Sequence, residues 1–274
     1  MNVRALAAWS AAALTISLST TNPLYRALVV LCALNLVLAA ERRDVRLRPL
    51  ISAVLVASTI AVLITLLLSH TGAHVLARIP DTVPAFGGAI TLEALVFGIT
   101  AGLGLGAALL ACAPLSLVAE PHELVDALPR QLARTGAAIG TALNLMPAMA
   151  QSAREIRDAQ RMRGWRARRI AGWPDVAVPA VLTSVESSLA LAEAMESRAY
   201  GGGPRTHYAL QRWSRFDTLV ALLSAAAAIV FIVLRVSGAA ADWYPFPTVT
   251  TPPISIAALA CCAALIVPSL RRVR

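Results

Sequence analysis

Residues 50–69 read LISAVLVASTIAVLITLLLS, a run of twenty residues without a charged side chain. A helix needs about 20 apolar residues to cross the hydrocarbon core of a bilayer. Hydrophobic residues make up 58% of the 274-residue chain and charged residues only 14%, and the mean hydropathy is +0.69. The sequence therefore predicts an all-α, polytopic membrane protein with about six transmembrane helices, at residues 5–20, 25–40, 50–69, 91–113, 216–236 and 254–270.

All 24 basic residues are arginine, and their distribution predicts the orientation of the chain. With a cytoplasmic N-terminus, 21 arginines fall on the cytoplasmic side and Arg26, Arg78 and Arg235 fall outside. Because cytoplasmic loops carry the excess of basic residues, both termini are expected in the cytoplasm, in a bacterial-type inner membrane. The net charge of +9 then reflects this topology and contact with the anionic leaflet rather than binding of nucleic acid.

The absence of lysine excludes several kinds of chemistry. A P-loop needs a lysine for the phosphates of ATP, and a Schiff-base enzyme needs an amine. Gly102, Gly104 and Gly106 lie inside a predicted span, where small residues permit close helix packing. The four cysteines are expected to be packing residues, because they fall in apolar spans without metal-ligand spacing: Cys32, Cys112, Cys261 and Cys262.

Residues 114–215, between the fourth and fifth predicted spans, have a mixed character, with 13 arginines against 9 acids. They contain two apolar helical stretches, 136–151 and 176–195, that are interrupted by proline and polar residues. Such stretches are expected to form long amphipathic helices that lie along or partly in the inner leaflet. The sequence thus predicts three regions: transmembrane helices 1–4 in 1–113, a cytoplasmic coupling region in 114–215, and transmembrane helices 5–6 in 216–274.

Two short segments of the coupling region each place an arginine where a helical stretch ends. They read Ala159-Gln160-Arg161-Met162-Arg163-Gly164 and Glu196-Ser197-Arg198-Ala199-Tyr200-Gly201. Behind Arg163 and Arg198, residues at helical spacing form a small, mostly apolar face. A single arginine of this kind can simply stabilise the negative end of its helix dipole. Two matched copies favour docking, because a planar guanidinium with five donors fits into a groove of a partner.

These motifs resemble the two signatures of the transmembrane T component of energy-coupling factor (ECF) transporters, a cobalt-transport permease-like family. The first signature is matched by Pro147, Glu155, Ile156, Ala159, Gln160, Met162, Arg163 and Gly164, and the second by Glu196, Ser197, Arg198, Ala199, Tyr200 and Gly201. The resemblance extends to Thr21-Asn22-Pro23-Leu24, to residues 91–95 and to residues 121–128, and so covers most of the chain. Each signature of that family reads Ala-Arg-Gly, whereas this chain has Met-Arg-Gly in the first and Ser-Arg-Ala in the second.

The resemblance implies a function without catalysis by this chain. In that family the arginines sit in grooves of cytoplasmic ABC ATPases, and the T component links two ATPases to a substrate-binding S component. Mg-ATP would bind to the partner ATPases, this chain would bind no cofactor, and the S component would capture a vitamin or a metal ion. The residues expected to contact the ATPases are Met162, Arg163, Gly164, Ser197, Arg198 and Ala199, and the other matched residues would support the coupling helices.

Glu93, near the outer end of a predicted span, has several possible roles. It can orient the helix end, contact an S component, or belong to a transport path or proton relay. His70 and His74, with Asp81 nearby, give thin support for a metal site, and none is expected. An ordinary ABC permease with its own substrate path is the alternative function, although few polar residues interrupt the spans. An intramembrane hydrolase is disfavoured, because no His, Cys or Ser groups with Glu93 or Glu186 in a catalytic spacing.

Overall fold

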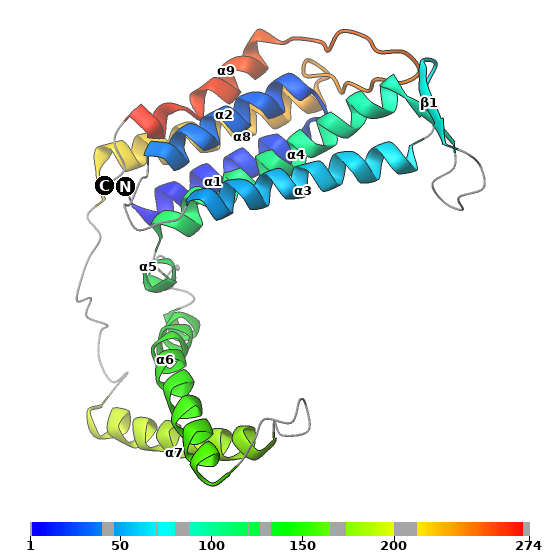
Figure 1. The fold of residues 1–274 in the computed structure, drawn as a ribbon. Helices are drawn as coiled ribbons and strands as arrows, with labels where there is room; N and C mark the ends of the chain where they lie inside the picture. The colour runs from blue at the N-terminus through cyan, green and yellow to red at the C-terminus, as the bar shows by residue number, and fades with distance from the viewer. Residues whose placement is uncertain are drawn as a thin grey trace. The chain divides into compact units, whose positions relative to one another are not determined.

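The computed structural model of the chain describes residues 2–39, 47–69, 71–79, 88–119, 121–126, 133–164, 174–199 and 213–270. The chain folds as two compact units, whose ribbons are drawn in Figure 1. Unit 1 comprises Met1–Glu120 and Arg212–Arg274, and unit 2 comprises Pro121–Gln211. Unit 2 is therefore an insertion between the two segments of unit 1.

Among its described residues, unit 1 contains six apolar helices, which fall at the six predicted spans. They are α1 (Val3–Ser19), α2 (Pro23–Ala39), α3 (Leu47–Leu68), α4 (Leu92–Val118), α8 (Arg215–Val236) and α9 (Ile256–Ala264). By length and composition α3, α4 and α8 can each cross a membrane, whereas α1 and α2 are shorter apolar helices of 17 residues. The predicted all-α, polytopic membrane fold is confirmed.

Two helix ends differ from the prediction. α4 continues to Val118, beyond the expected end at 113. α9 ends at Ala264, although the predicted span runs to 270, because Leu265 and Ile266 donate to carbonyls only three residues back. A short 3-10 helix, Val267–Leu270, follows, and its Pro268 has no N–H with which to continue an α-helix.

A β-hairpin that the sequence did not predict connects α3 to α4. Its strands, β1 (Val75–Ile79) and β2 (Gly88–Thr91), are antiparallel, with Ala77 opposite Ile90. We expected these residues to form an outer loop, with the next span beginning at Thr91. The run of β1 is too short to span a membrane as a strand or a helix, and it pairs its main-chain groups within the hairpin instead.

One face of α1 forms the centre of unit 1. Its buried apolar side chains recur every three or four residues and include Leu6, Trp9, Ala13 and Ile16. α1 packs against α4 and α8, while α2 and α9 also contact each other (Figure 1). The ring of Tyr25 in α2 meets that of Phe231 in α8 edge to face, with 5.8 Å between the centroids. A helical period thus places the large apolar side chains of several helices in one core.

α3 lies against α4 along a row of glycines. Gly98, Gly102 and Gly106 recur every four residues on α4, and each faces α3. A Cβ on Gly102 would lie 2.9 Å from the carbonyl oxygen of Ser58, and one on Gly106 would lie 2.9 Å from the hydroxyl of the same serine. The close approach of the two helices therefore requires glycine, as the sequence predicted for Gly102 and Gly106.

Gly104 faces α2 rather than α3. A Cβ on Gly104 would lie 2.7 Å from Cζ of Arg26, whose guanidinium rests on α4. Nη1 of Arg26 donates to the carbonyl oxygen of Thr100 at 2.7 Å. Arg26, which the topology places on the outer side, is thus bonded to the neighbouring helix.

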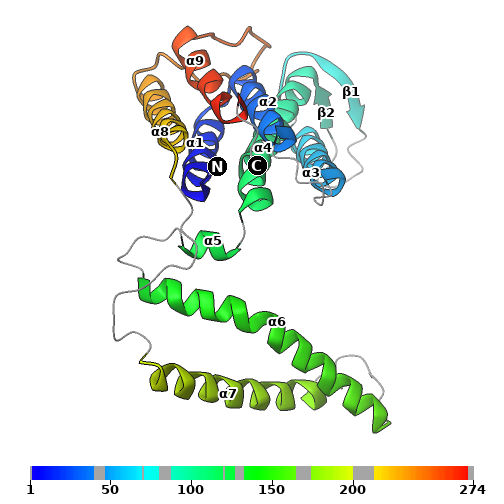
Figure 2. The ribbon, with the colours of Figure 1, turned by 90° about the vertical axis from the view of Figure 1, so that its left-hand side faces the viewer.

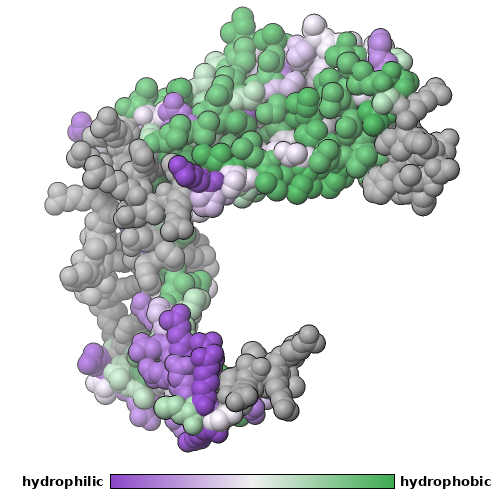
Figure 3. Space-filling view, viewed as in Figure 1, coloured by the Kyte–Doolittle hydropathy of each residue, from purple (hydrophilic) through white to green (hydrophobic). Residues whose placement is uncertain are grey.

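Among its described residues, unit 2 contains α5 (Pro121–Asp126), α6 (Ala133–Met162) and α7 (Pro174–Ser197). α6 and α7 pack against each other (Figure 2). No residue of α7 is buried, and the helix exposes a row of aliphatic side chains: Val178, Val181, Leu182, Val185 and Leu189. Figure 3 shows apolar side chains over the visible face of unit 1 and many polar side chains on unit 2. We expected α7 to lie along the inner leaflet, but its length and composition also allow it to cross a membrane.

Candidate coupling site

α6 ends in a left-handed turn at the first arginine motif. The main-chain N–H of Arg163 donates to the carbonyls of Ala159 and Gln160, at 3.2 and 3.1 Å. The N–H of Gly164 donates to the carbonyl of Arg161 at 3.0 Å. Gly164 has φ +85°, and no atom lies within 4 Å of the position of a Cβ. Because glycine adopts this conformation without steric cost, Gly164 stops the helix directly after Arg163.

α7 ends in the same way at the second arginine motif. Ala199 donates its main-chain N–H to the carbonyl of Glu196 at 2.9 Å and has φ +49°. A residue with a Cβ is disfavoured in this conformation by about 1–2 kcal/mol. Ala199 therefore occupies the position that glycine takes in the first motif, and each arginine immediately precedes a left-handed residue. Tyr200 and Gly201, which complete the second signature, lie outside the described residues.

Both arginines are exposed at their helix ends. All six residues predicted to dock are exposed, and Met162 is 84% exposed. In the part of the chain that the structure describes, neither Arg163 nor Arg198 forms an ion pair, whereas Arg161 lies 3.7 Å from the carboxylate of Asp158. The two guanidinium groups are therefore available to a partner, and the flexible Met162 adds an adaptable apolar contact beside one of them.

The two motifs lie at opposite ends of α7. The side-chain amide of Gln160, three residues before Arg163, donates to the main-chain carbonyl of Asp175 at 3.3 Å. This contact joins the end of α6 to the start of α7. α7 has 24 residues, so Arg198 lies about 36 Å from that point. The structure thus keeps the two predicted docking residues apart instead of bringing them into one site.

The remaining residues of the first signature lie within α6. Pro147 lies inside the helix, and Glu155 accepts a hydrogen bond from the side chain of Gln151 at 3.1 Å. Ile156 is half-buried, while Ala159 is exposed. These residues lie along the helix behind Arg163, as the helical spacing in the sequence predicted.

Glu93 holds the start of α4 to the segment before β1. Its carboxylate is fully buried and lies 2.8 Å from Nδ1 of His74, whose side chain is 70% exposed. The main-chain N–H of His74 also donates to both carboxylate oxygens, at 3.3 and 3.2 Å. Gly72 leaves room for this contact, because a Cβ there would lie 2.5 Å from Oε2 of Glu93. This geometry supports orientation of the helix end as the role of Glu93.

The sequence-based expectation about metals concerned histidine and cysteine. Among the described residues, no group of three or more His, Cys, Asp or Glu side chains can hold a metal ion. His70 and Asp81 lie outside the described residues. Three of the four cysteines are buried packing residues, as expected, whereas Cys112 is exposed on α4.

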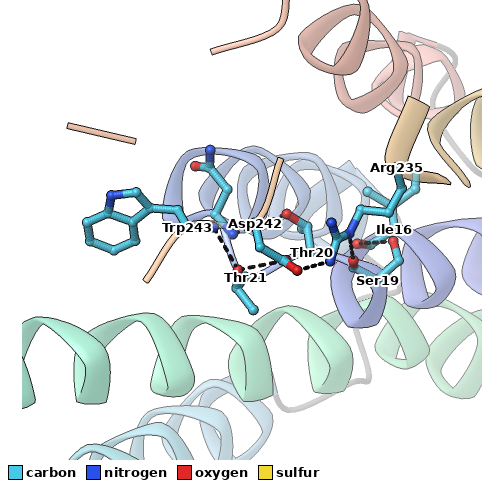
Figure 4. A network of polar contacts seen from close by, with 8 residues as sticks. Ile16, Ser19, Thr20, Thr21, Arg235, Asp242 and Trp243 are labelled. Carbon is cyan, nitrogen blue, oxygen red and sulfur yellow. Dashed lines mark hydrogen bonds and ion pairs between the residues drawn. The ribbon is translucent and has the colours of Figure 1, made fainter. Parts of the chain in front are cut away.

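A polar network that the sequence did not predict joins the turn between α1 and α2 to the segment after α8 (Figure 4). Nε of Arg235 donates to the carbonyl of Ser19 at 2.8 Å, and the same guanidinium forms an ion pair with Asp242. The hydroxyl of Thr21 donates to Asp242 at 3.0 Å and accepts the main-chain N–H of Trp243 at 3.0 Å. These contacts fix the ends of α1 and α8 to each other.

The neighbouring Asn22 has two structural roles. Its side-chain oxygen accepts the N–H of Leu24 at 3.0 Å, which caps the start of α2, and its amide donates to the carbonyl of Pro253 at 2.8 Å. The Thr21-Asn22-Pro23-Leu24 run thus serves the fold of unit 1. One part of the network could have been predicted from the sequence. Arg235 is one of the few arginines on the predicted outer side, and an acidic residue that can pair with it, Asp242, follows seven residues later.

The apolar helices of unit 1 and the exposed, arginine-tipped helices of unit 2 define a polytopic helical membrane protein. The chain belongs to the family of the cobalt transport protein CbiQ, whose sequence model matches residues 1–208. The matched region includes both arginine motifs and ends before α8. The comparison with curated proteins gives no match. The protein is therefore a component of a membrane transport system.

Proposed function

We propose that the chain is the energy-coupling T component of an ECF transporter. It links ATP hydrolysis by two cytoplasmic ABC ATPases to a substrate-binding S component that takes up a vitamin or a metal ion. The observation that carries this proposal is the pair of exposed arginines at opposite ends of α7. Because the two arginines lie at separate helix ends, each can bind a different ATPase.

Each arginine offers a planar cation that forms paired hydrogen bonds with carboxylates in a groove of an ATPase. The left-handed turn at Gly164 or Ala199 ends the helix directly beyond the arginine, so the helix does not continue past the tip. Mg-ATP is bound and hydrolysed by the partner ATPases. This chain contributes the tips and the helices that carry them.

The cytoplasmic end of unit 1 follows from the helix directions and the arginine distribution. The main-chain N–H of Asn2 donates to Asp217 at 3.0 Å, so α1 and α8 begin at the same end. Arg235 bonds to Ser19 near their other ends, so the two helices are parallel. Because α8 follows the arginine-rich coupling region, we assign the end that holds Asn2 and Asp217 to the cytoplasm.

An ordinary permease with its own substrate path is less well supported. Within the described residues, the buried charged side chains are Glu93 and Asp217, and each lies in the first turn of its helix. The buried polar side chains further along the helices are small hydroxyls: Ser10, Ser17, Thr100 and Ser224. A path for a polar substrate is usually lined by ionisable or strongly polar groups inside the membrane.

Copurification of the partners tests the proposal. The full-length chain is expressed with the two ATPases and the S component, and the recovered ATPases are quantified together with uptake. Arg163→Ala and Arg198→Ala should each weaken both, because loss of a charge-assisted docking contact costs about 2–5 kcal/mol. The double variant should nearly abolish both.

Arg161→Ala is the matched control, because Arg161 lies on the same helix end but already pairs with Asp158. It should leave recovery of the ATPases and uptake close to the unaltered values. If the double variant of Arg163 and Arg198 copurified with ATPases at unaltered levels and supported ATP-driven uptake, the proposed function would be wrong.

A further inference from the structure

Nearly all residues of unit 2 whose burial is described are exposed or half-buried. Among the residues of this unit whose burial is described, only Val125 in α5 and Gly136 in α6 are buried. The two lie side by side: a Cβ on Gly136 would lie 3.7 Å from Cγ1 and from the carbonyl oxygen of Val125. A Cβ on Gly140, one turn further along α6, would lie 3.8 Å from the same methyl group. Val125 therefore lies over two glycines on one face of α6.

This contact determines where α5 lies on α6. α5 has six residues, too few for a helix to be stable by itself. Its other described aliphatic side chain at this point, Leu124, is 39% exposed, whereas Val125 is only 9% exposed. A Cβ at Gly136 or Gly140 would make only an ordinary van der Waals contact with Val125, so the position of α5 depends on the side chain of Val125 rather than on the lack of a side chain at the glycines. Among the side chains of α5 whose burial is described, Val125 is thus the buried apolar one that lies against α6.

α5 also lies on the path of the chain from the membrane helices to the first arginine motif. α4 ends at Val118 and α5 begins at Pro121. α6 has 30 residues, so it is about 45 Å long and ends directly before Arg163. A small change in the angle between α5 and α6 therefore moves Arg163 by a large distance.

We infer that Val125 is a positioning residue for energy coupling, because its contact with Gly136 and Gly140 holds α6 at a fixed angle to α5. Displacement of Arg163 by an ATPase is then passed to α5 and along the chain toward α4. Without the contact, α6 would change its angle independently and the displacement would be lost. The inference rests on the proposed function for the source of the displacement, whereas the contact can be tested by itself.

Pulsed electron paramagnetic resonance can test the contact in the full-length chain. Spin labels on Leu124→Cys and Ala150→Cys, both exposed positions, report the distance between α5 and the middle of α6, in a chain whose exposed Cys112 is changed to serine. We expect one narrow distance distribution. Val125→Ala should broaden it, because this change removes the methyl group that lies over both glycines.

Two control variants separate this contact from general effects on unit 2. Ile139→Ala removes an exposed aliphatic side chain from the same turn of α6 and should leave the distribution narrow. Gly136→Ala should also leave it narrow, because a Cβ at 3.7 Å makes an ordinary contact. A broad distribution with Val125 intact, or no change with Val125→Ala, would overturn the inference.

The complete transporter in proteoliposomes tests the consequence for coupling. Val125→Ala should leave recovery of the ATPases unchanged, because both arginines are intact. It should lower the uptake of ⁵⁷Co²⁺ per ATP hydrolysed by about twofold to thirtyfold, as for residues that alter coupling without contacting a ligand. Ile139→Ala and Val125→Ile should preserve this ratio, and an unchanged ratio in Val125→Ala would contradict the inference. If the ATPases did not copurify with the unaltered chain, the proposed function would fail, while the distance measurement would still decide the role of Val125.

Discussion

The indole N–H of Trp9 in α1 donates to the main-chain carbonyl of Leu265, 2.8 Å away at the end of α9. Both residues are buried, so no solvent can replace this bond. Leu265 is the residue at which α9 stops being α-helical, and its carbonyl has no partner within that helix. The first described helix therefore stabilises the end of the last one.

Trp9→Phe should destabilise the protein by about 1–3 kcal/mol, because the buried carbonyl of Leu265 would be left without a donor. Thermal unfolding of the purified chain in detergent measures this change. Trp213→Phe is the control, because Trp213 is half exposed and its indole N–H bonds to an exposed threonine hydroxyl. Equal losses of thermal stability in the two variants would show that the buried bond to Leu265 contributes no more to stability than the exposed bond of Trp213.

Lysine should replace either docking arginine poorly. Arg163→Lys and Arg198→Lys retain the charge but not the planar fork of donors, so recovery of the ATPases should stay well below that of the unaltered chain. Arg161→Lys, on the same helix end, should have little effect. Full recovery in both lysine variants would mean that charge alone holds the ATPases.

The ends of α6 and α7 predict opposite effects of exchanging glycine and alanine. Ala199→Gly should stabilise the end of α7, because it removes a left-handed cost of about 1–2 kcal/mol, and Gly164→Ala should destabilise the end of α6 by a similar amount. Amide hydrogen exchange, read by mass spectrometry on the peptides around residues 164 and 199, measures both changes. Slower exchange after Gly164→Ala would be incompatible with the left-handed turn.

The glycine row between α3 and α4 should tolerate no side chain. Gly102→Ala places a Cβ 2.9 Å from the carbonyl oxygen of Ser58, so it should cost about 1–3 kcal/mol, the usual range for overpacking. The loss should appear as a lower unfolding temperature in detergent. Gly136→Ala is the matched change at a site with an ordinary contact distance, and it should be neutral or slightly stabilising.

The orientation can be tested by labelling single cysteines in a chain with Cys112→Ser. An impermeant maleimide should reach Leu76→Cys and Tyr244→Cys from outside intact cells, since both positions are exposed. Tyr244 follows Trp243, which bonds to Thr21 at the end of α1 opposite Asn2, and Leu76 lies in β1, which precedes the start of α4. Met162→Cys, beside Arg163, should react only after the membrane is permeabilised. Labelling of position 162 in intact cells would reverse the assigned orientation.

The sequence located the membrane helices because a span must satisfy its main chain and its apolar environment within one continuous segment. It misplaced the end of α9 because the turn at Leu265 and Ile266 lies inside an apolar run, and the carbonyl that this turn leaves without a helical partner is satisfied by Trp9, which is distant in sequence. It missed the β-hairpin because the start of that element is held by a contact between His74 and Glu93, 19 residues apart, for which Gly72 leaves room. Local periodicity carries no information on contacts of this kind.

The arginine motifs were found from sequence because each is a local pattern at a helix end. Their separation was not predictable in the same way, since it depends on the bond between Gln160 and Asp175 and on the uninterrupted length of α7. The left-handed conformation of Ala199 could not be predicted from the sequence either, because alanine rarely adopts it. Val125 was one of several apolar residues in its segment until its contact with two glycines distinguished it.

The length of α7 has a consequence for the ATPases in the proposed complex. A continuous helix has a fixed rise per residue, so two grooves that hold Arg163 and Arg198 approach each other most readily if α6 rotates relative to α7 near Gln160. An insertion of seven residues in α7 would keep Arg198 on nearly the same side but move it about 10 Å outward, whereas two residues would turn it to another side. Relatives of this chain are therefore expected to vary α7 in composition more readily than in length.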